Sequence, residues 1–195
     1  MVLLFSFRSS VADWYYVPTG SMEPTIQVGD RVVVDKSAYT LELPFTDVVV
    51  AKTGNINRGD IVIIDSNAAD TRLIKRVVAI EGDKVKLENN VLFINGEKAT
   101  LSVKGHNLYS EQILGQTRTI ALNPLPSPAK NFNLVTVPRD HVLAMGDNRN
   151  NSVDSRYYGF IPIEEIQAKA NSVAFSLDPD DMYLPRKDRL FTSLQ

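Results

Sequence analysis

The chain has 195 residues, of which 44% are hydrophobic, so it can bury one sizeable core, or a main domain with a small β appendage. Its 21 Lys and Arg residues nearly balance 23 Asp and Glu residues, and the net charge of −2 provides no basic field, so we expect no nucleic-acid partner. The absence of cysteine excludes a thiol nucleophile, a Cys-zinc site and disulfides, and two histidines are too few for most His-rich metal sites, so we expect no metal and no cofactor.

The N-terminal segment, residues 1–13, begins with the short apolar run MVLLFSFRSS. A membrane span needs about 20 residues and the core of a signal peptide about 7–15, so this run is neither. It is the trimmed end of a longer apolar segment, or a disordered or packed start. Trp14, Tyr15 and Tyr16 follow, and such a cluster suits a membrane interface, although a buried edge strand explains it equally well.

Residues 17–26, VPTGSMEPTI, place Ser21 on a glycine-containing bend between two prolines. Ser is a favoured helix cap, but Pro24 occupies the N3 position that such a cap would serve. Proline has no N–H to offer and pushes Glu23 away from α geometry. A surface turn and a presented nucleophile remain, and a nucleophile needs a base elsewhere in the chain.

Short β-type runs, broken by Gly, Asp and Asn, make this mostly a β protein. Turn signals at Asn89-Asn90 and Asn95-Gly96 join three of the strands into a meander. The region from Ala99 to Leu134 is polar and Pro-broken, so residues 84–134 are expected to form a small loop-rich β subdomain with little chemistry of its own. The expected strands lie at 31–34, 60–65, 72–80, 84–87, 91–94, 134–137 and 141–145.

One short helix is expected near the C-terminus, at IEEIQAKA, residues 163–170, entered through Pro162. We divide the chain into the membrane-proximal segment 1–13, a main domain at 14–175 that contains the subdomain, and a tail at 176–195.

The strand RLIKRVVAI, residues 72–80, presents one basic side chain on each face by strict alternation. One explanation of this Lys and Arg is that the segment is an edge strand, whose basic side chains block aggregation. The functional interpretation is that Lys75, flanked on its face by Leu73 and Val77, is desolvated, which lowers the pKa of a lysine. A lysine that is neutral near pH 7 can take a proton from a serine hydroxyl.

The loop GDNRNNSVDSR, residues 146–156, concentrates polar side chains. A calcium loop is disfavoured because Arg149 stands where a carboxylate or amide is needed. A plain hydrogen-bonded turn network remains an alternative, and we attribute the glycosylation-like tripeptide at 150–152 to chance. We favour a third interpretation, in which the loop supports an active site. Its hydroxyls can orient a lysine, and an Asp154–Arg156 pair can fix the conformation of the turn.

Five segments between Tyr15 and Ala170 together resemble the conserved boxes of type I signal peptidases. One box is a weak indication, whereas five in register and in the family's order are specific. They are PTGSMEPT at 18–25, VGDRVVV at 28–34, RGDIVII at 58–64, RLIKRVVAIEGD at 72–83 and GDNRNNSVDSRYYGFIP at 146–162.

The resemblance implies a mainly β Ser–Lys peptidase that removes signal peptides from exported preproteins, with residues 14–175 as its catalytic domain. It implies an enzyme associated with the bacterial cytoplasmic membrane and its lipid surface, acting on the outer face. By position it makes Ser21 the nucleophile, Lys75 the general base and Thr19 the side-chain donor to the oxyanion. The Ser21 N–H is the second donor, and Ser152 orients Lys75. Supporting roles fall on Asp147, Asp154 and Arg156.

Substrates of the family carry small side chains at the first and third positions before the cut, in the Ala-x-Ala style. Bound as an added strand, such a peptide points both side chains the same way. The family's pocket positions fall on Tyr15, Val17, Met22, Ile26 and Ile74. Val153 stands where many members carry a smaller residue, and no full membrane span precedes the serine box.

Three alternatives remain. Self-cleaving repressors share the dyad but need a DNA-binding helical domain and a cleavable linker, which this sequence does not show. Processing peptidases of conjugation systems are disfavoured by the GDNR loop. A non-catalytic β module that binds exported chains is disfavoured by the intact Ser21, Lys75 and Ser152.

Overall fold

The structure, a computed structural model, describes residues 12–42, 49–124 and 127–194. Most of the predicted N-terminal segment lies outside these residues. In the described part every pairing between named strands is antiparallel, which confirms the expected mainly β, antiparallel fold.

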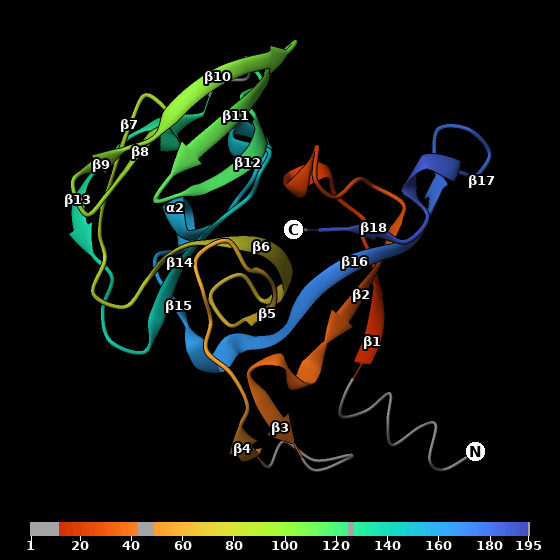
Figure 1. Cartoon of the computed structure of the whole chain (residues 1–195), viewed down its shortest axis with the longest axis horizontal. Coiled ribbons are helices and arrows are strands. Elements are labelled where there is room, and N and C mark those ends of the chain that lie inside the picture. Colours follow the sequence, from red (N-terminus) through yellow and green to blue (C-terminus); the bar gives the residue numbers. More distant parts are fainter. Residues whose placement is uncertain (1–11, 43–48, 125–126, 195) are drawn as a thin grey trace.

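The main sheet has nine strands and runs in the order β1-β2-β16-β5-β6-β14-β15, with β17 and β18 paired to β16 (Figure 1). Its strands come from both ends of the chain, so the N-terminal and C-terminal halves fold as one sheet. The bounds are β1 Ala12–Tyr16, β2 Asp30–Asp35, β5 Ile61–Ser66, β6 Thr71–Ile80, β14 His141–Met145, β15 Ile161–Pro162, β16 Ile166–Asp178, β17 Leu184–Pro185 and β18 Thr192–Ser193.

Two smaller sheets, β13-β7-β8-β9 and β10-β11-β12, lie beside the main sheet, at the upper left of Figure 1. Residues 99–121 are thus richer in strands than their polar composition suggested. A two-stranded sheet pairs β3 with β4. The bounds are β3 Thr40–Glu42, β4 Val49–Lys52, β7 Lys84–Glu88, β8 Val91–Ile94, β9 Glu97–Lys98, β10 Thr100–Gly105, β11 Leu108–Ile113, β12 Gln116–Ala121 and β13 Phe132–Thr136.

Both predicted hairpin turns are confirmed. The central residues of each turn have positive φ: 48° and 65° at Asn89 and Asn90, and 52° and 86° at Asn95 and Gly96. Asn and Gly tolerate this left-handed conformation, which two-residue turns of the primed types require. The turns join β7 to β8 and β8 to β9.

The helix expected at residues 163–170 is wrong. Residues Ile163–Glu165 form a single 3₁₀ turn, and β16 begins at Ile166. Along β16, Ile166, Ala168 and Ala170 are buried and alternate with partly exposed residues, which is the period of a strand. The α-helix among the described residues is instead α2, Ser155–Tyr158. The other helical turns are η1 Gly20–Met22, η2 Lys36–Ala38, η3 Pro128–Lys130, η4 Arg149–Asn151 and η6 Lys187–Arg189.

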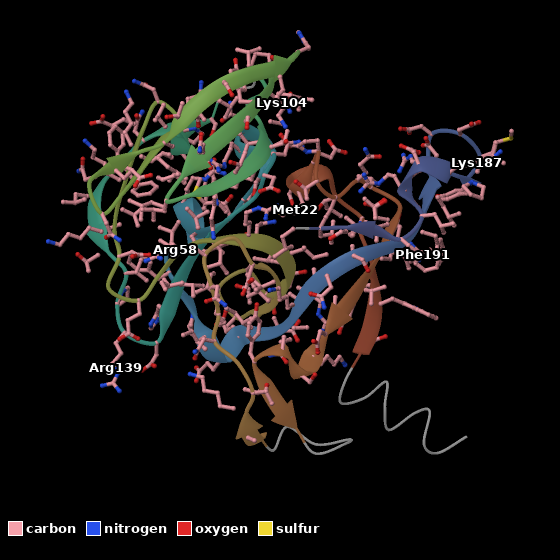
Figure 2. All side chains as sticks on the ribbon, viewed as in Figure 1. Met22, Arg58, Lys104, Arg139, Lys187 and Phe191 are labelled. Carbon is pink, nitrogen blue, oxygen red and sulfur yellow. The ribbon has the colours of Figure 1, made fainter. Side chains whose placement is uncertain are left out.

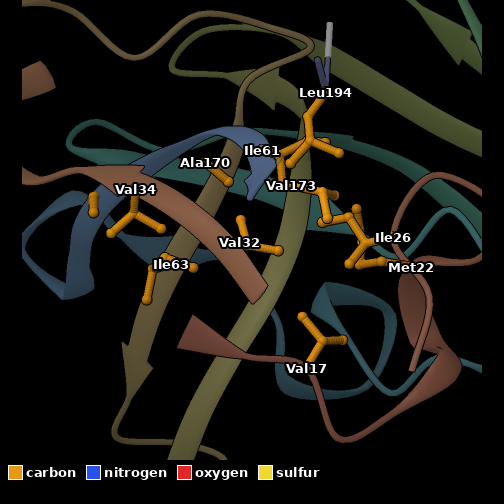
Figure 3. Close-up of a cluster of buried hydrophobic side chains, with 11 residues drawn as sticks. Val17, Met22, Ile26, Val32, Val34, Ile61, Ile63, Ala170, Val173 and Leu194 are labelled. Carbon is orange, nitrogen blue, oxygen red and sulfur yellow. The ribbon is translucent and has the colours of Figure 1, made fainter. Parts of the chain in front are cut away.

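A buried apolar cluster anchors the segment that carries Ser21 (Figure 3). Met22 and Ile26 are 1% and 0% exposed, and they pack with side chains from β2, β5 and β16. Burying such a side chain contributes about 1.5–3 kcal/mol. These two anchors hold residues 22–26, which directly follow Ser21, against the main sheet.

Candidate active site

Ser21 lies within η1, between an extended Thr19 and an extended Glu23. The turn closes through a 3.1 Å bond from the Glu23 N–H to the Gly20 carbonyl, and the Ile26 N–H donates to Met22. Ser21 is therefore inside a helical turn and not its cap. The first N–H groups of such a turn have no partner within it, which leaves the Ser21 N–H available to a ligand.

Lys75 lies beside Ser21. Its Nζ is 2.9 Å from Ser21 Oγ and 3.0 Å from the Ile74 carbonyl oxygen. Strand β6 lies between β5 and β14, so the edge-strand explanation of this lysine is wrong. The sheet leaves Lys75 only 4% exposed.

Burial lowers the pKa of Lys75 to about 8, because the ammonium loses its hydration. The charge of Asp154 opposes this shift, and that of Arg156 adds to it. Neutral Lys75 is therefore far more abundant near pH 7 than an ordinary lysine amine would be, and a neutral amine can accept the Ser21 proton.

Asp154 organises the polar loop behind the lysine. Its carboxylate accepts hydrogen bonds from the Gly146 N–H at 2.9 Å, from Ser152 Oγ at 2.7 Å and from Arg156. Burial alone would raise the pKa of Asp154, but the Arg156 guanidinium holds it below its usual value. The predicted Asp154–Arg156 pair is thus present, at 2.8 Å.

Ser152 is buried and bonds to Asp154. The hydrogen bonds of Lys75 among the described residues go to Ser21 and Ile74, so the orienting role of Ser152 stays a prediction. The Ser152 hydroxyl is nevertheless close to η1, because both Ser152 Oγ and the Ser21 carbonyl lie against Gly146.

Asp147 connects strand β6, which carries Lys75, to the segment that carries Ser21. Its two carboxylate oxygens accept from Arg76 at 2.9 and 2.7 Å, and Thr25 Oγ1 lies 2.5 Å from one of them. Both charges are buried, and removing one partner of a buried pair typically costs about 3–5 kcal/mol. Arg76, which neighbours Lys75, was not singled out from the sequence as a site residue.

Asn148 also escaped the sequence analysis as an individual residue. Its N–H donates to the Ser21 carbonyl at 3.1 Å, and its side-chain amide donates to the Gly20 carbonyl at 3.0 Å. Asn123 in turn donates to the Asn148 side chain. The polar loop therefore holds η1 directly through the backbone carbonyls of Gly20 and Ser21, and a sequence pattern does not reveal such contacts.

Gly146 permits this close approach. A Cβ at this position would lie 2.4 Å from the Ser21 carbonyl oxygen and 2.3 Å from Ser152 Oγ. The backbone oxygen cannot move without displacing the turn. We expect Gly146→Ala to lower kcat on an Ala-x-Ala peptide by about 10²-fold, the cost of misplacing reacting groups by about 1 Å.

Gly105→Ala is the matched control, because a Cβ at Gly105 meets open space. Steady-state kinetics and melting temperatures of both variants check the expectation. Unchanged kcat in Gly146→Ala would show that the contact with Ser21 is not needed for turnover.

A family profile described as "Signal peptidase, peptidase S26" matches residues 1–175. The chain belongs to the type I signal peptidases of this family. Signal peptidase I from Pseudomonas aeruginosa is 32% identical over 97% of this chain and 74% of its own length. Signal peptidase IB from Staphylococcus aureus is 32% identical over 87% of this chain and 81% of its own length.

The five predicted pocket residues differ in their accessibility. Val17, Met22 and Ile26 belong to the buried cluster of Figure 3, whereas Tyr15 and Ile74 pack against that cluster and remain partly exposed. Tyr15 and Ile74 thus have surface to offer a peptide of the kind that signal peptidases cleave. Contact with the other three requires movement of their neighbours, and their pocket role stays a prediction.

The tail beyond residue 175, outside the signal peptidase match, supports residues 25–30, which follow Ser21 in the chain. Arg189 donates to both Asp30 carboxylate oxygens and to the Thr25 carbonyl, and Arg186 donates to the Val28 carbonyl at 2.7 Å. Leu194 packs into the same cluster as Met22. No sequence pattern signalled these contacts, because they join segments at opposite ends of the chain.

The described residues contain no group of three or more His, Cys, Asp or Glu side chains arranged to hold a metal ion. The chemistry offered by the site is that of a hydroxyl beside a desolvated amine.

Proposed function

We propose that this chain removes signal peptides from exported preproteins, with Ser21 as nucleophile and Lys75 as general base. Membership of the signal peptidase family supports a serine endopeptidase that cleaves signal peptides. The observation that supports the dyad most strongly is the 2.9 Å separation of Ser21 Oγ from the Nζ of a lysine that is 4% exposed. Ser–Lys pairs are a recognised variant of the serine nucleophile and its base.

In the first step Lys75 takes the Ser21 proton as Oγ bonds to the scissile carbonyl carbon. The carbonyl oxygen becomes an oxyanion, which the Ser21 N–H and the Thr19 hydroxyl stabilise. The Lys75 ammonium then passes its proton to the leaving amine, and the acylated Ser21 remains. Water then attacks this ester with Lys75 again as base, the bond between the acyl carbon and Ser21 Oγ breaks, and Lys75 returns the proton to Oγ. Asp154 and Asp147, whose charges favour the protonated lysine, stabilise the charge that Lys75 carries between these steps.

The substrate is an extended segment with small side chains at the first and third positions before the cut. Tyr15 lies on β1, at one end of the strand order in the main sheet, where an extended peptide can bind. The reaction needs no metal or cofactor.

Cleavage of a synthetic Ala-x-Ala peptide tests the function. The wild-type chain should cut after the second Ala, and Ser21→Ala, which differs by one oxygen atom, should be inactive. Equal cleavage by the two proteins would disprove the role of Ser21. Failure of both to cleave would favour a non-catalytic module that binds exported chains.

Membrane association on the outer face of the cytoplasmic membrane is the second part of the proposal. No helix among the residues that the structure describes is long and apolar enough to span a bilayer. Large apolar side chains are exposed on β1 and on the tail, and Phe191 is labelled there in Figure 2. Aromatic side chains of this kind favour the lipid interface. The exposed aromatic residues include Trp14, Tyr16, Tyr183 and Phe191, which are 57%, 45%, 62% and 76% exposed, and Met182 beside Tyr183 is 85% exposed.

Sedimentation with phosphatidylcholine vesicles tests this surface. Trp14→Ser combined with Phe191→Ser should release the protein from the vesicles and leave cleavage of a soluble peptide unchanged. Undiminished vesicle binding by this double variant would contradict the docking surface.

A further inference from the structure

Two adjoining cavities, of about 350 and 420 Å³, lie between the main sheet and β12 of the three-stranded sheet β10-β11-β12. They share Arg76, Thr117 and Arg118 in their walls. Leu194 lines the first cavity, and Pro24 and Thr25, shortly after Ser21 in the chain, line the second. In Figure 1 this is the region between β12, β6 and the end of the chain.

Most cations in these walls have a carboxylate of their own. Arg58 pairs with Asp83, Arg76 with Asp147, and Lys169 with Asp60. Lys104 lines the second cavity, and its amine lies 3.3 Å from Thr119 Oγ1. Lys104 and Arg118 are thus the wall cations that have no carboxylate of their own among the described residues.

Arg118 shares its carboxylate. Both Arg118 and the fully buried Arg149 bond to Glu111, at 2.6 Å in each case. The charge of Asp147, which pairs with Arg76, also acts on both arginines, so three guanidinium groups here share two carboxylates. A buried charge without a partner is unfavourable. The pKa of Arg118 is accordingly lowered, first by burial, and the nearby Arg149 lowers it further.

The Arg118 guanidinium also has unused donors. The side chain is 8% exposed, and its Nε bonds to Glu111. Its Nη2 is buried without a hydrogen-bond partner, and Nη1 makes no hydrogen bond to any described residue. Buried polar groups in proteins are normally bonded, so the orphaned Nη2 points to a missing ligand.

We infer that the cleft binds a small oxyanion at Arg118. A guanidinium presents two N–H groups in a planar fork that matches a carboxylate or phosphate. Thr117 and Thr119 also line the second cavity. The anion comes from one of two sources, free phosphate or an acidic side chain of the polypeptide substrate. The second source rests on the proposed function, and it is argued from the position of Pro24 and Thr25 in the wall.

Thermal unfolding in sodium phosphate, compared with sodium chloride at equal ionic strength, tests the site without any cleavage. We expect a saturable rise in Tm for the wild-type chain and for Ser21→Ala. Arg118→Gln should lose this rise, while Glu111 stays paired with Arg149 and the fold is kept. Arg139→Gln is the control, because Arg139 is 85% exposed and projects from the far side of the molecule (Figure 2).

A second variant covers the case in which Arg118→Gln does not fold. Arg118→Lys keeps the charge without the fork and should weaken phosphate binding by at least about tenfold, the equivalent of one charged hydrogen bond. A Tm that responds equally to phosphate and chloride, or a phosphate response unchanged in both Arg118 variants, would overturn the anion site.

Two cleavable peptides, with Asp or Asn at the second position after the cut, distinguish the sources. A higher kcat/KM for the Asp peptide that disappears in Arg118→Gln assigns the anion to the substrate. Equal kcat/KM for the two peptides, together with saturable phosphate binding, assigns it to the free ion. Absence of cleavage by the wild-type chain as well as by the Arg118 variants would refute the proposed function and leave the phosphate result standing.

Discussion

Replacing Lys75 by arginine should abolish peptide cleavage. A guanidinium stays protonated in proteins, so the arginine side chain could not accept the Ser21 proton even if it reached Oγ. General-base catalysis typically contributes about 10²- to 10⁴-fold, and kcat/KM on an Ala-x-Ala peptide should fall by at least this factor. Lys75→Met should be equally inactive, because it removes the amine and keeps an apolar side chain of similar length.

Lys86→Arg is the matched control for this change. Lys86 lies on β7, pairs with Glu88 at 2.8 Å and is partly exposed, so arginine can keep the pair. Circular dichroism and Tm establish that each variant is folded. Turnover near that of the wild type in a folded Lys75→Arg protein would exclude Lys75 as the base.

Thr19→Val should lower kcat by about 10²- to 10³-fold, the typical cost of one oxyanion donor. Thr19 is exposed, adopts an extended conformation immediately before η1, and its hydroxyl does not cap that turn. The hydroxyl is thus free to bond an oxyanion beside Ser21. Because the interaction strengthens in the transition state, KM should change little.

Thr19→Ser keeps the hydroxyl and should retain most of the activity, whereas Thr19→Ala should behave like Thr19→Val. Steady-state kinetics on the three variants decide the matter. If Thr19→Val matches the wild type in kcat, another group stabilises the oxyanion.

Much of the fold was predictable because its signals are local. The alternation of residues 72–80 predicted β6, and Asn95-Gly96 predicted a hairpin turn. The prediction of a helix at residues 163–170 was wrong because Glu164, Glu165 and Ala168 have high helix propensity. Burial of alternate residues against β5 and β2 overrode that propensity, as long-range sheet pairing often does.

The site was predictable only in part. The residues that the resemblance assigned to the dyad, Ser21 and Lys75, lie together in the structure. Asn148, Gly146 and Arg189 act on the backbone of residues 20–25, and backbone contacts leave no pattern of residue types. Glu111 was hidden for another reason: the polar composition of residues 99–134 was interpreted as a loop-rich region, whereas this side chain is buried against Arg149.

The pH dependence of kcat/KM on an Ala-x-Ala peptide tests the central claim most directly, because it reports the protonation state of the base in the free enzyme. The folded-state pKa of Lys75 is lowered to about 8, so the neutral, active form is lost as pH falls through this value. We predict that kcat/KM is level well above pH 8, falls about tenfold per pH unit below it, and at pH 6 is roughly 100-fold lower while the protein remains folded. A profile that is flat between about pH 6 and 8, or that rises as the pH falls, would contradict the assignment of Lys75 as the base of Ser21.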